Sequence, residues 1–275
     1  MGRPAMVFVM KRSEPRLFPA LIKHWRGRRG LSQLDLALSA NVSARHVSFL
    51  ETGRAQPSRE MILRLAAALG IPLRDQNALL QAAGFEDAFD DPGLHASSAG
   101  PIQLAIERML EQQEPFPMTV LDRRYDVVRT NRGADRLFAR LVADPSAVRA
   151  PLNIFHALFD PRLARPFILD WERVARSLLS RLHRESLEKP SDGDLAALVR
   201  SLFEYPGVPQ DWQTPDLSLP SEPCLTFRIK RDALELAFLT TVTVFNAPQN
   251  VTLEELKLES YFPLDDATRK ACEAS

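Results

Sequence analysis

The chain has 275 residues, of which 45% are hydrophobic and 25% are charged, and its net charge at pH 7 is zero. This composition is typical of a folded globular protein and not of a disordered one, and the length allows about two domains of ordinary size. No apolar run approaches about 18 residues, which excludes a membrane-spanning helix.

The zero net charge conceals an asymmetry along the chain. Residues 1–64 contain 12 basic and four acidic side chains, so this segment carries +8 and the remainder carries −8. A basic N-terminal unit joined to an acidic remainder predicts a polyanionic partner for the first unit alone. A solvated helical surface would have the same charge, so charge alone does not decide between the two.

The N-terminal residues 1–15 contain one short apolar patch, Met6–Met10, followed by two basic residues. The patch is too short for the core of a signal peptide, so we interpret residues 1–15 as a loose tail. Cys224 and Cys272 have neither disulfide nor metal-binding spacing. We therefore expect a cytoplasmic protein without a metal site, a required cofactor or an association with membranes.

Two helical patterns follow the tail. The first ends at Gly30, a residue type that commonly terminates helices, and its expected apolar face consists of Leu17, Ala20, Leu21 and Trp25. Ser32 is placed to cap a second, short helix, and Asp35 stands three residues later in the capping-box position. We expect this second helix to bury Leu34, Ala37 and Leu38.

The segment "ANV" that follows is very short, and its Asn41 tolerates the left-handed conformation of a sharp turn. Ser43 is placed to cap a third helix in which Val47 and Leu50 face inward. Two more helices complete the unit. The fourth runs from Ser58 to Leu69 and is expected to bury Met61, Leu65, Ala68 and Leu69, and the fifth runs from Leu73 to Ala83 and ends at Gly84.

Two short helices joined by a tight turn and packed by three others predict a helix-turn-helix, whose second helix enters the major groove of DNA. Arg45 is our first candidate for base recognition, because its planar guanidinium fits guanine O6 and N7. Ala44 is a candidate for contact with a thymine methyl group, and the weaker base candidates are His46, Ser48 and Phe49. The candidates for phosphate contact are Arg28, Ser32, Gln33, Ser43 and Arg54.

Residues 31–70 resemble the Xre or lambda-repressor type of five-helix DNA-binding domain. The shared pattern is an "LSQ" helix start, an alanine in the second helix, and an apolar-x-x-apolar-Glu third helix followed by "GR" and "PS". The matching residues are Leu31, Ser32, Gln33, Ala37, Val47, Leu50, Glu51, Gly53, Arg54, Pro57 and Ser58. Asn41 stands where that family usually has glycine, which changes the strain of the turn more than the function.

The resemblance continues beyond this domain and covers nearly the whole chain from Arg16 onward. The segments that are similar to the MmyB-like subfamily of these regulators are "RHVSFLETGRAQPSREMILRLAAALGIPLRDQNALLQAAGF" (45–85), "LDRRYDVVRTN" (121–131), "YPGVP" (205–209) and "PQNVTLEELKLESYFP" (248–263). This resemblance implies a PAS-like ligand-binding domain after the DNA-binding domain. It also implies lipid-like ligands such as fatty acids.

The second half of the chain has the features of a separate domain. Residues 86–100 are acidic and rich in small and turn-forming residues, which predicts a linker between a DNA-binding domain at 16–85 and a second domain at 101–270. Strand-like runs at 118–122 and 125–130 predict a hairpin. Helical patterns cover 102–112, 131–141, 162–187 and 192–204, and strand patterns return at 224–231, 234–245 and 256–263.

This order of elements predicts an antiparallel five-stranded sheet with helices on one face. The expected fold class is therefore α+β, with an N-terminal all-α five-helix lambda-repressor-like domain and a C-terminal PAS-like domain. A sheet covered by helices can enclose an apolar pocket with few polar groups. The candidate lining residues are Phe155, Leu158, Trp171, Phe227 and Phe238, although these residue types also form ordinary cores. Arg173 and Arg228 are candidates for binding a carboxylate head group, with an exposed surface position as the alternative.

The sequence has no GxSxG, HExxH, GxGxxG or P-loop motif, so we expect no enzymatic activity and no catalytic residues. We interpret the chain as a bacterial one-component transcription regulator that binds double-stranded DNA and is controlled by a small, apolar, fatty-acid-like ligand. A homodimer is expected, because one domain of this kind reads a half-site. Other readings remain open. The second domain could bind no ligand and only dimerise, or it could recruit a protein partner. In the second case, the whole chain could also be a scaffold that does not bind DNA.

Overall fold

The computed structural model describes residues 17–93, 100–188, 193–214, 224–245, 248 and 250–274. The predicted tail at 1–15, together with residues 94–99 of the predicted linker, lies outside these residues. The chain divides into two compact units, one of residues 1–91 with 247–254 and the other of residues 92–246 with 255–275. None of the described helices is both long and apolar enough to cross a membrane.

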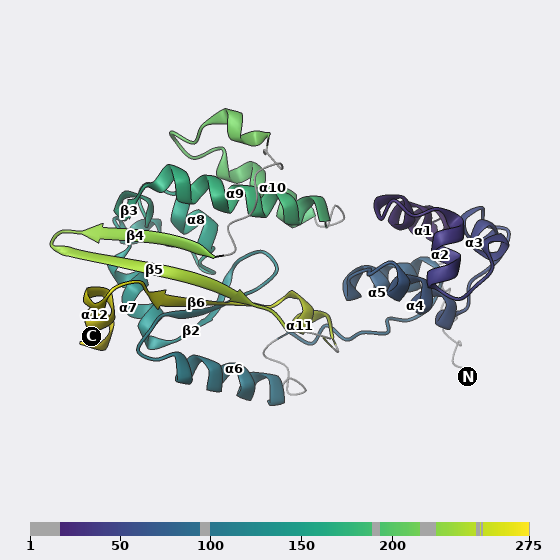
Figure 1. Ribbon diagram of the computed structural model, residues 1–275, viewed down its shortest axis with the longest axis horizontal. Coiled ribbons are helices and arrows are strands. Elements are labelled where there is room, and N and C mark those ends of the chain that lie inside the picture. Colours follow the sequence, from purple (N-terminus) through teal and green to yellow (C-terminus); the bar gives the residue numbers. More distant parts are fainter. Residues whose placement is uncertain are drawn as a thin grey trace, which may run out of the picture. The chain divides into compact units, whose positions relative to one another are not determined.

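Five helices form the first unit, as predicted (Figure 1). They are α1 (Leu17–Arg28), α2 (Gln33–Ser39), α3 (Ala44–Glu51), α4 (Arg59–Ala68) and α5 (Leu73–Ala82). Ser32 caps α2 in a complete capping box with Asp35, and Ser43 caps α3 by accepting a hydrogen bond from the backbone N–H of His46. Asn41 has a φ of 52°, which confirms the left-handed turn predicted between α2 and α3.

The buried faces of three helices differ from the predicted ones. The core contains Phe18 and Ile22 of α1, Leu36 of α2, and Ile62 and Ala66 of α4. Three leucines that were predicted to be buried are exposed: Leu17 (53%), Leu34 (58%) and Leu38 (72%). Ala20 is also exposed, and Met61 and Ala68 are half-buried. Apolar residues stand on several sides of these short helices, so helical spacing fits more than one face. Packing among the five helices selects the buried one.

The carboxylate of Glu51, at the end of α3, is buried and joins three helices. Arg26 of α1 donates to it twice, from Nε to Oε1 at 2.5 Å and from Nη2 to Oε2 at 2.9 Å. Gln33 at the start of α2 donates from Nε2 to Oε2 at 2.8 Å. The Arg26 side chain also donates from Nη1 to the carbonyl oxygen of Leu31 at 2.7 Å. One buried charge therefore sets the positions of α1 and α2 relative to α3.

A short helix from near the end of the chain also belongs to the first unit. This helix is α11 (Val251–Glu255), and it was not predicted; residues 247–254 were expected in the second domain. Oε2 of Glu254 accepts a hydrogen bond from the backbone N–H of Leu73 at 2.7 Å, and the Val251 N–H donates to the carbonyl oxygen of Asp90 at 3.0 Å. The N-cap residue of α5, Pro72, makes no side-chain cap, so Glu254 satisfies a backbone group that would otherwise lack a partner.

The second unit is built on an antiparallel sheet in the order β2-β1-β6-β5-β4-β3. Its strands are β1 (Met118–Leu121), β2 (Val127–Thr130), β3 (Ile168–Leu169), β4 (Leu225–Arg231), β5 (Leu234–Thr243) and β6 (Lys257–Pro263). Five of these strands were predicted. The sixth, β3, has two residues and pairs with Arg228 and Ile229 of β4, and it is too short to produce an alternating pattern.

The described helices of this unit are α6 (Gly100–Gln113), α7 (Arg132–Arg140), α8 (Ile154–Phe159), α9 (Trp171–Glu188), α10 (Gly193–Leu202) and α12 (Asp266–Glu273), with single 3₁₀ turns at Pro145–Ala147, Arg165–Phe167 and Gln210–Gln213. The predicted helices at 102–112, 131–141 and 192–204 are confirmed. The helix predicted at 162–187 begins only at Trp171, because Pro166 lies in the 3₁₀ turn and β3 follows it. The helices α8 and α12 were not predicted.

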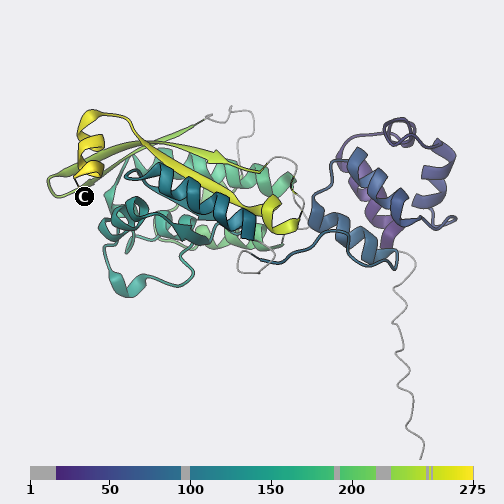
Figure 2. The same cartoon turned by 90° about the horizontal axis from the view of Figure 1, so that it is seen from below.

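The main core of the second unit lies between one face of the sheet and the helices α7 to α10. Alternate strand residues point into it, among them Phe227 of β4 and Tyr261 of β6. On the opposite face, Val120 of β1 pairs with Leu258 of β6, both are fully buried, and α6 packs against β1. Seen from below, α6 lies in front of the sheet, whereas α9 and α10 lie behind it (Figure 2). Different helices therefore cover the two faces of the sheet.

Replacing Glu51 with alanine tests the buried ion pair. We expect Glu51→Ala to lower the free energy of unfolding by about 3–5 kcal/mol, because it leaves the guanidinium of Arg26 unpaired at a position that is only 15% exposed. Glu60→Ala is the matched control, since Glu60 forms an exposed i,i+4 pair with Arg64. That change should cost less than about 0.5 kcal/mol. Urea unfolding measures both, and similar losses in the two variants would contradict the role of Glu51.

The same carboxylate predicts a pH dependence of stability. Burial raises the pKa of Glu51, but hydrogen bonds from Arg26 and Gln33, together with the positive charges of Arg26 and Lys23, outweigh burial and leave the pKa below its ordinary value. The ionised carboxylate therefore contributes its full stabilisation of the fold above the unfolded-state pKa of about 4.3. This stabilisation is lost as the pH falls through the lower folded-state pKa. Over urea titrations from about pH 6 down to about pH 3, Glu51→Gln should lose less stability than the wild type. A parallel loss would argue against this origin.

Candidate nucleic-acid interface and ligand pocket

On the outer side of α3, the aromatic ring of Phe49 lies beside two arginines, Arg45 of the helix and Arg54 after its end. Val47, Leu50 and Glu51 face inward. On the outer side, the guanidinium carbon of Arg45 lies 5.2 Å from the centre of the half-buried Phe49 ring, and that of Arg54 lies 6.0 Å from it. Cation–π contact at these distances orients both guanidiniums without occupying their N–H donors. The donors remain available for an anion or for base edges.

The start of α3 lies beside this cluster. Oγ of the exposed Ser43 accepts from the His46 N–H at 3.1 Å, which leaves the hydroxyl hydrogen available to donate. Ala44, His46 and Ser48 are half-buried residues of the same helix. The N-terminal end of a helix attracts phosphate groups through its free N–H groups and its dipole. The structure therefore brings five base candidates onto a single helix, with the phosphate candidate Ser43 at its N-cap and Arg54 just beyond its end.

The other predicted phosphate contacts have different surroundings. Ser32 is exposed at the start of α2. Gln33 is half-buried, and one of its amide N–H groups is directed inward to Glu51. The guanidinium carbon of Arg28, also half-buried, lies 5.3 Å from the Trp25 ring. For Gln33 the structure thus adds a structural role that sequence reasoning did not identify.

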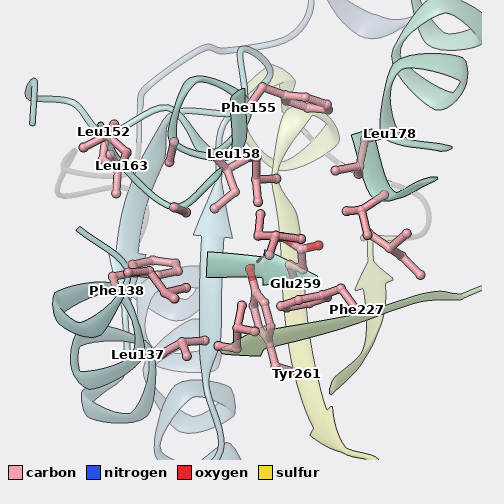
Figure 3. Close-up of a pocket in the computed structure, with 18 of the residues that line it drawn as sticks. Leu137, Phe138, Leu152, Phe155, Leu158, Leu163, Leu178, Phe227, Glu259 and Tyr261 are labelled. Atoms are coloured by element: carbon pink, nitrogen blue, oxygen red, sulfur yellow. Dashed lines mark hydrogen bonds between the residues drawn. The ribbon is translucent and has the colours of Figure 1, made fainter. Parts of the chain in front are cut away.

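A narrow cavity of about 70 Å³ lies between α7, α8, α9 and the sheet of the second unit. It is lined by Leu137, Phe138, Leu141, Val142, Leu152, Ile154, Phe155, Ala157, Leu158, Leu163, Ala164, Ile168, Val174, Leu178, Arg181, Leu225, Phe227, Ile229, Glu259 and Tyr261. Leucine and phenylalanine side chains surround the oxygens of Glu259 and Tyr261 (Figure 3). Apart from those two residues and Arg181, the lining is entirely apolar, which suits an apolar ligand with one polar end.

Three of the five predicted lining residues, Phe155, Leu158 and Phe227, lie on this cavity, and two do not. Trp171 is not among the lining residues: its Nε1 donates to the carbonyl oxygen of Leu158 at 2.8 Å, and the guanidinium carbon of Arg165 lies 3.7 Å from its ring centre. Phe238 is fully buried, and its ring centre lies 5.9 Å from that of Phe227. Phe238 therefore lies in the core behind Phe227 and packs against it without lining the cavity.

The polar end of the cavity comes from β6 and α9. The hydroxyl of Tyr261 donates to Oε2 of Glu259 at 3.1 Å. Burial raises the pKa of Glu259 above its ordinary value and outweighs the opposing effects of Arg181 and of the Tyr261 hydrogen bond. Burial also raises the pKa of Tyr261 well above its ordinary value. Among the residues that line the cavity, the half-buried Arg181 is the only cationic one.

The arginines that the sequence suggested for a carboxylate lie elsewhere. Nη2 of Arg173 donates to the carbonyl oxygen of Thr226 at 2.7 Å, and Nη1 of Arg228 lies 3.6 Å from Oε1 of Glu235 on the exposed side of the sheet. Neither lines the cavity. Sequence reasoning missed Glu259, because residues 258–261 of β6 are all buried and "KLESYFP" has no alternating pattern that marks an inward face. Among the described residues, no group of His, Cys, Asp or Glu side chains is arranged to hold a metal ion.

Comparison with known proteins gives matches for both units. Residues 102–274 match the family model described as MmyB-like transcription regulator ligand binding domain, and residues 22–76 match the model described as helix-turn-helix. The curated HTH-type transcriptional regulator DdrOP3 of Deinococcus deserti is 34% identical over 112 residues, which cover 34% of this chain and 87% of that protein.

One solved structure, described as that of an RNA-binding light-oxygen-voltage receptor, aligns with 96% of this chain at 12% identity. The chain spans 62% of the length of that receptor. The TM-score is 0.26, too low for a conclusion about fold or function.

Proposed function

This chain belongs to the MmyB-like family of helix-turn-helix transcription regulators, and we propose that it binds a specific double-stranded DNA sequence through α3 under the control of a fatty-acid-like ligand. The observation that carries the proposal is the presence, in one chain, of an exposed arginine-bearing helix and an apolar cavity with a single polar end. The proposal includes no catalytic step.

The DNA-binding part rests on geometry and charge. Arg45 lies near the N-terminal end of α3, where a helix in the major groove reaches the base edges, whereas Arg54 follows the helix, where the sugar-phosphate backbone passes. The excess positive charge of residues 1–64 supplies the non-specific attraction to DNA. We therefore assign base recognition to Arg45, with Ala44, His46, Ser48 and Phe49 beside it, and phosphate binding to Arg54.

The ligand part rests on the chemistry of the cavity. Its wall is almost wholly aliphatic and aromatic, so desolvation favours an apolar chain, and the single polar end gives that chain a direction. A fatty acid has this combination of an apolar tail and one polar head. The family assignment supports a ligand in this unit without naming its chemical class.

Regulation requires that the ligand distinguish two arrangements of the protein. The cavity of about 70 Å³ is smaller than the roughly 300–1,000 Å³ typical of small-molecule sites, so a long-chain ligand enters only when the lining side chains move apart. The ligand then has a higher affinity for the wider arrangement and shifts the population toward it. If that arrangement also has a different affinity for DNA, binding of the ligand changes the affinity for DNA, and binding of DNA changes the affinity for the ligand.

The small cavity also favours one alternative, a second unit with a filled core that dimerises or recruits a protein partner without a ligand. A homodimer is part of both proposals, because a single helix-turn-helix reads one half-site. The two proposals differ in whether an apolar acid binds the second unit and changes DNA affinity.

Substitutions of Arg45 on α3 and of Arg54 after it test the DNA-binding assignment. We expect Arg45→Ala to cost about 1–3 kcal/mol on the specific site and little on random duplex DNA, because only the specific site offers its guanine. Arg54→Ala should weaken both alike and reduce the slope of affinity against salt concentration by about one. Fluorescence anisotropy at several salt concentrations measures these effects. Arg108→Ala, which removes an exposed arginine of α6, is the charge-matched control. Equal losses on both DNAs for Arg45→Ala would remove its assignment to base recognition.

Filling the cavity tests the ligand-binding assignment. We expect dodecanoate to change the DNA affinity of the wild type by about 5- to 150-fold, and Leu158→Trp to abolish this response, because the indole occupies the ligand's space. Leu104→Trp is the matched control, since Leu104 lies on α6 and is 54% exposed. Native mass spectrometry should detect bound dodecanoate in the wild type and the control only. Absence of binding to the wild type would favour the ligand-free alternative.

A further inference from the structure

The loop at residues 141–152, between α7 and α8, forms part of the cavity wall. Three residues at its two ends line the cavity and are half-buried, namely Leu141, Val142 and Leu152. Residues 148–151 of the same loop are exposed. A small hydrophobic cluster, separate from the main core, consists of Val142, Ala147, Leu152, Ala157 and Leu163. In Figure 3, Leu152 and Leu163 lie together at one side of the cavity. The loop therefore stands between the cavity and water.

Arg231, the last residue of β4, holds the first end of this loop. Its Nη1 donates to the carbonyl oxygen of Arg140 at 2.6 Å and to that of Val142 at 3.3 Å. Its guanidinium carbon lies 4.9 Å from the centre of the Phe167 ring. Carbonyl groups at the end of a helix lack partners within the helix, and a charged donor is a strong partner for them. One half-buried side chain thus fastens the end of α7 and the start of the loop to the sheet.

The second end of the loop is held by the backbone. The N–H of Val127 donates to the carbonyl oxygen of Leu152 at 2.7 Å, and the N–H of Ile154 donates to that of Tyr125 at 3.0 Å. These two bonds join the end of the loop to the chain at the start of β2, as neighbouring strands are joined. The two ends therefore differ, because one depends on a single side chain and the other on paired backbone groups.

The middle of the loop bonds mainly to itself. The carboxylate of Asp144 accepts a hydrogen bond from the Ser146 N–H at 2.9 Å, and Nη1 of Arg149 donates to the carbonyl oxygen of Ser146 at 2.8 Å. A backbone hydrogen bond to the neighbouring chain runs from the Asp144 N–H to the carbonyl oxygen of Arg162 at 2.7 Å. A segment with few bonds to its surroundings opens locally at low cost. The loop can therefore move as one piece about its second end.

We propose that residues 141–152 are a flap through which an apolar ligand enters the cavity, and that Arg231 is the latch that keeps the flap closed. A ligand that needs more room than about 70 Å³ must displace part of the wall, and this loop is a weakly bonded part. When Arg231 releases the carbonyl groups of Arg140 and Val142, the first end of the flap is free to move. The inference rests on the proposed ligand-binding function and adds the route and the control of entry.

Hydrogen exchange of the ligand-free, full-length protein tests the latch. Arg231→Met retains an apolar stem beside Phe167 and removes both hydrogen bonds. Amides of residues 141–148 should exchange about tenfold to hundredfold faster in this variant, the range expected for the loss of a hydrogen bond from a charged group, while amides of β6 keep the wild-type rate. Arg228→Met is the matched control, since Arg228 lies on the same strand and pairs with Glu235 on the exposed side of the sheet. Equal exchange of the loop in both variants would overturn the latch and leave the proposed function intact.

Ligand kinetics test the flap as the route of entry. Transfer of dodecanoate from the protein to an excess of phosphatidylcholine vesicles gives the dissociation rate, and calorimetric titration gives the Kd, so the association rate follows. Because the ligand passes the flap in both directions, Arg231→Met should raise both rates by about tenfold to hundredfold and change the Kd by less than about threefold. A weaker Kd with an unchanged association rate would reduce Arg231 to a structural residue of the wall.

A second variant covers the case in which Arg231→Met does not fold. Arg231→Lys retains the charge but has a shorter head without the planar geometry, so it should raise both rates by about threefold to tenfold. Wild-type rates in Arg231→Lys would then overturn the latch. Absence of dodecanoate binding to the wild-type protein would overturn the proposed function, and the flap as a route of entry with it.

Discussion

The buried carboxylate of Glu51 is the constraint on which the presentation of α3 depends. A charge removed from water must be neutralised and hydrogen-bonded, so Arg26 and Gln33 are drawn to it from two other helices. Because Glu51 ends α3, satisfying its charge also sets the direction in which the opposite side of that helix faces. Arg45 and Phe49 point outward as the counterpart of this inward contact. The glutamate of the "FLE" segment therefore has a structural role, although it stands among residues that contact DNA in our proposal.

In the second unit, the charged groups of the cavity are not paired with each other. There Arg181 and Glu259 line the same cavity without forming an ion pair, whereas Arg26 and Glu51 satisfy each other almost completely. Satisfied charges stabilise one arrangement and leave nothing for a ligand to improve. An incompletely satisfied charge in an apolar wall lowers stability, and it gives a suitable ligand something to restore. The first pair therefore stabilises the fold, whereas the second leaves the buried Nε of Arg181 without a hydrogen bond to any described residue.

Local signals in the sequence were reliable, and long-range ones were not. Ser32, Ser43 and Asn41 were read correctly because a cap or a left-handed turn depends on residues a few positions away. The prediction of the buried face of α2 was wrong. Leu34, Leu36 and Leu38 give this seven-residue helix two apolar sides, and only packing against the other helices selects the one that is buried. Arg181 could not have been identified, since a single arginine in the arginine-rich helix α9 carries no sign that its Nε becomes buried. Of the candidate cavity, sequence reasoning therefore supplied apolar lining residues but not the polar end.

The contact between Glu254 and the first turn of α5 has a consequence for synthesis. The first unit is discontinuous: its first segment ends at residue 91, and Glu254, which completes the start of α5, follows Leu73 by 181 positions. A nascent chain consequently exposes an α5 terminus without its cap throughout translation of most of the second unit. The N-terminal unit can reach its full set of contacts only after residue 254 has been synthesised, and at that point every strand of the sheet except β6 has also been synthesised. A chain interrupted before that point would retain α3 and its arginines, but on a less stable unit.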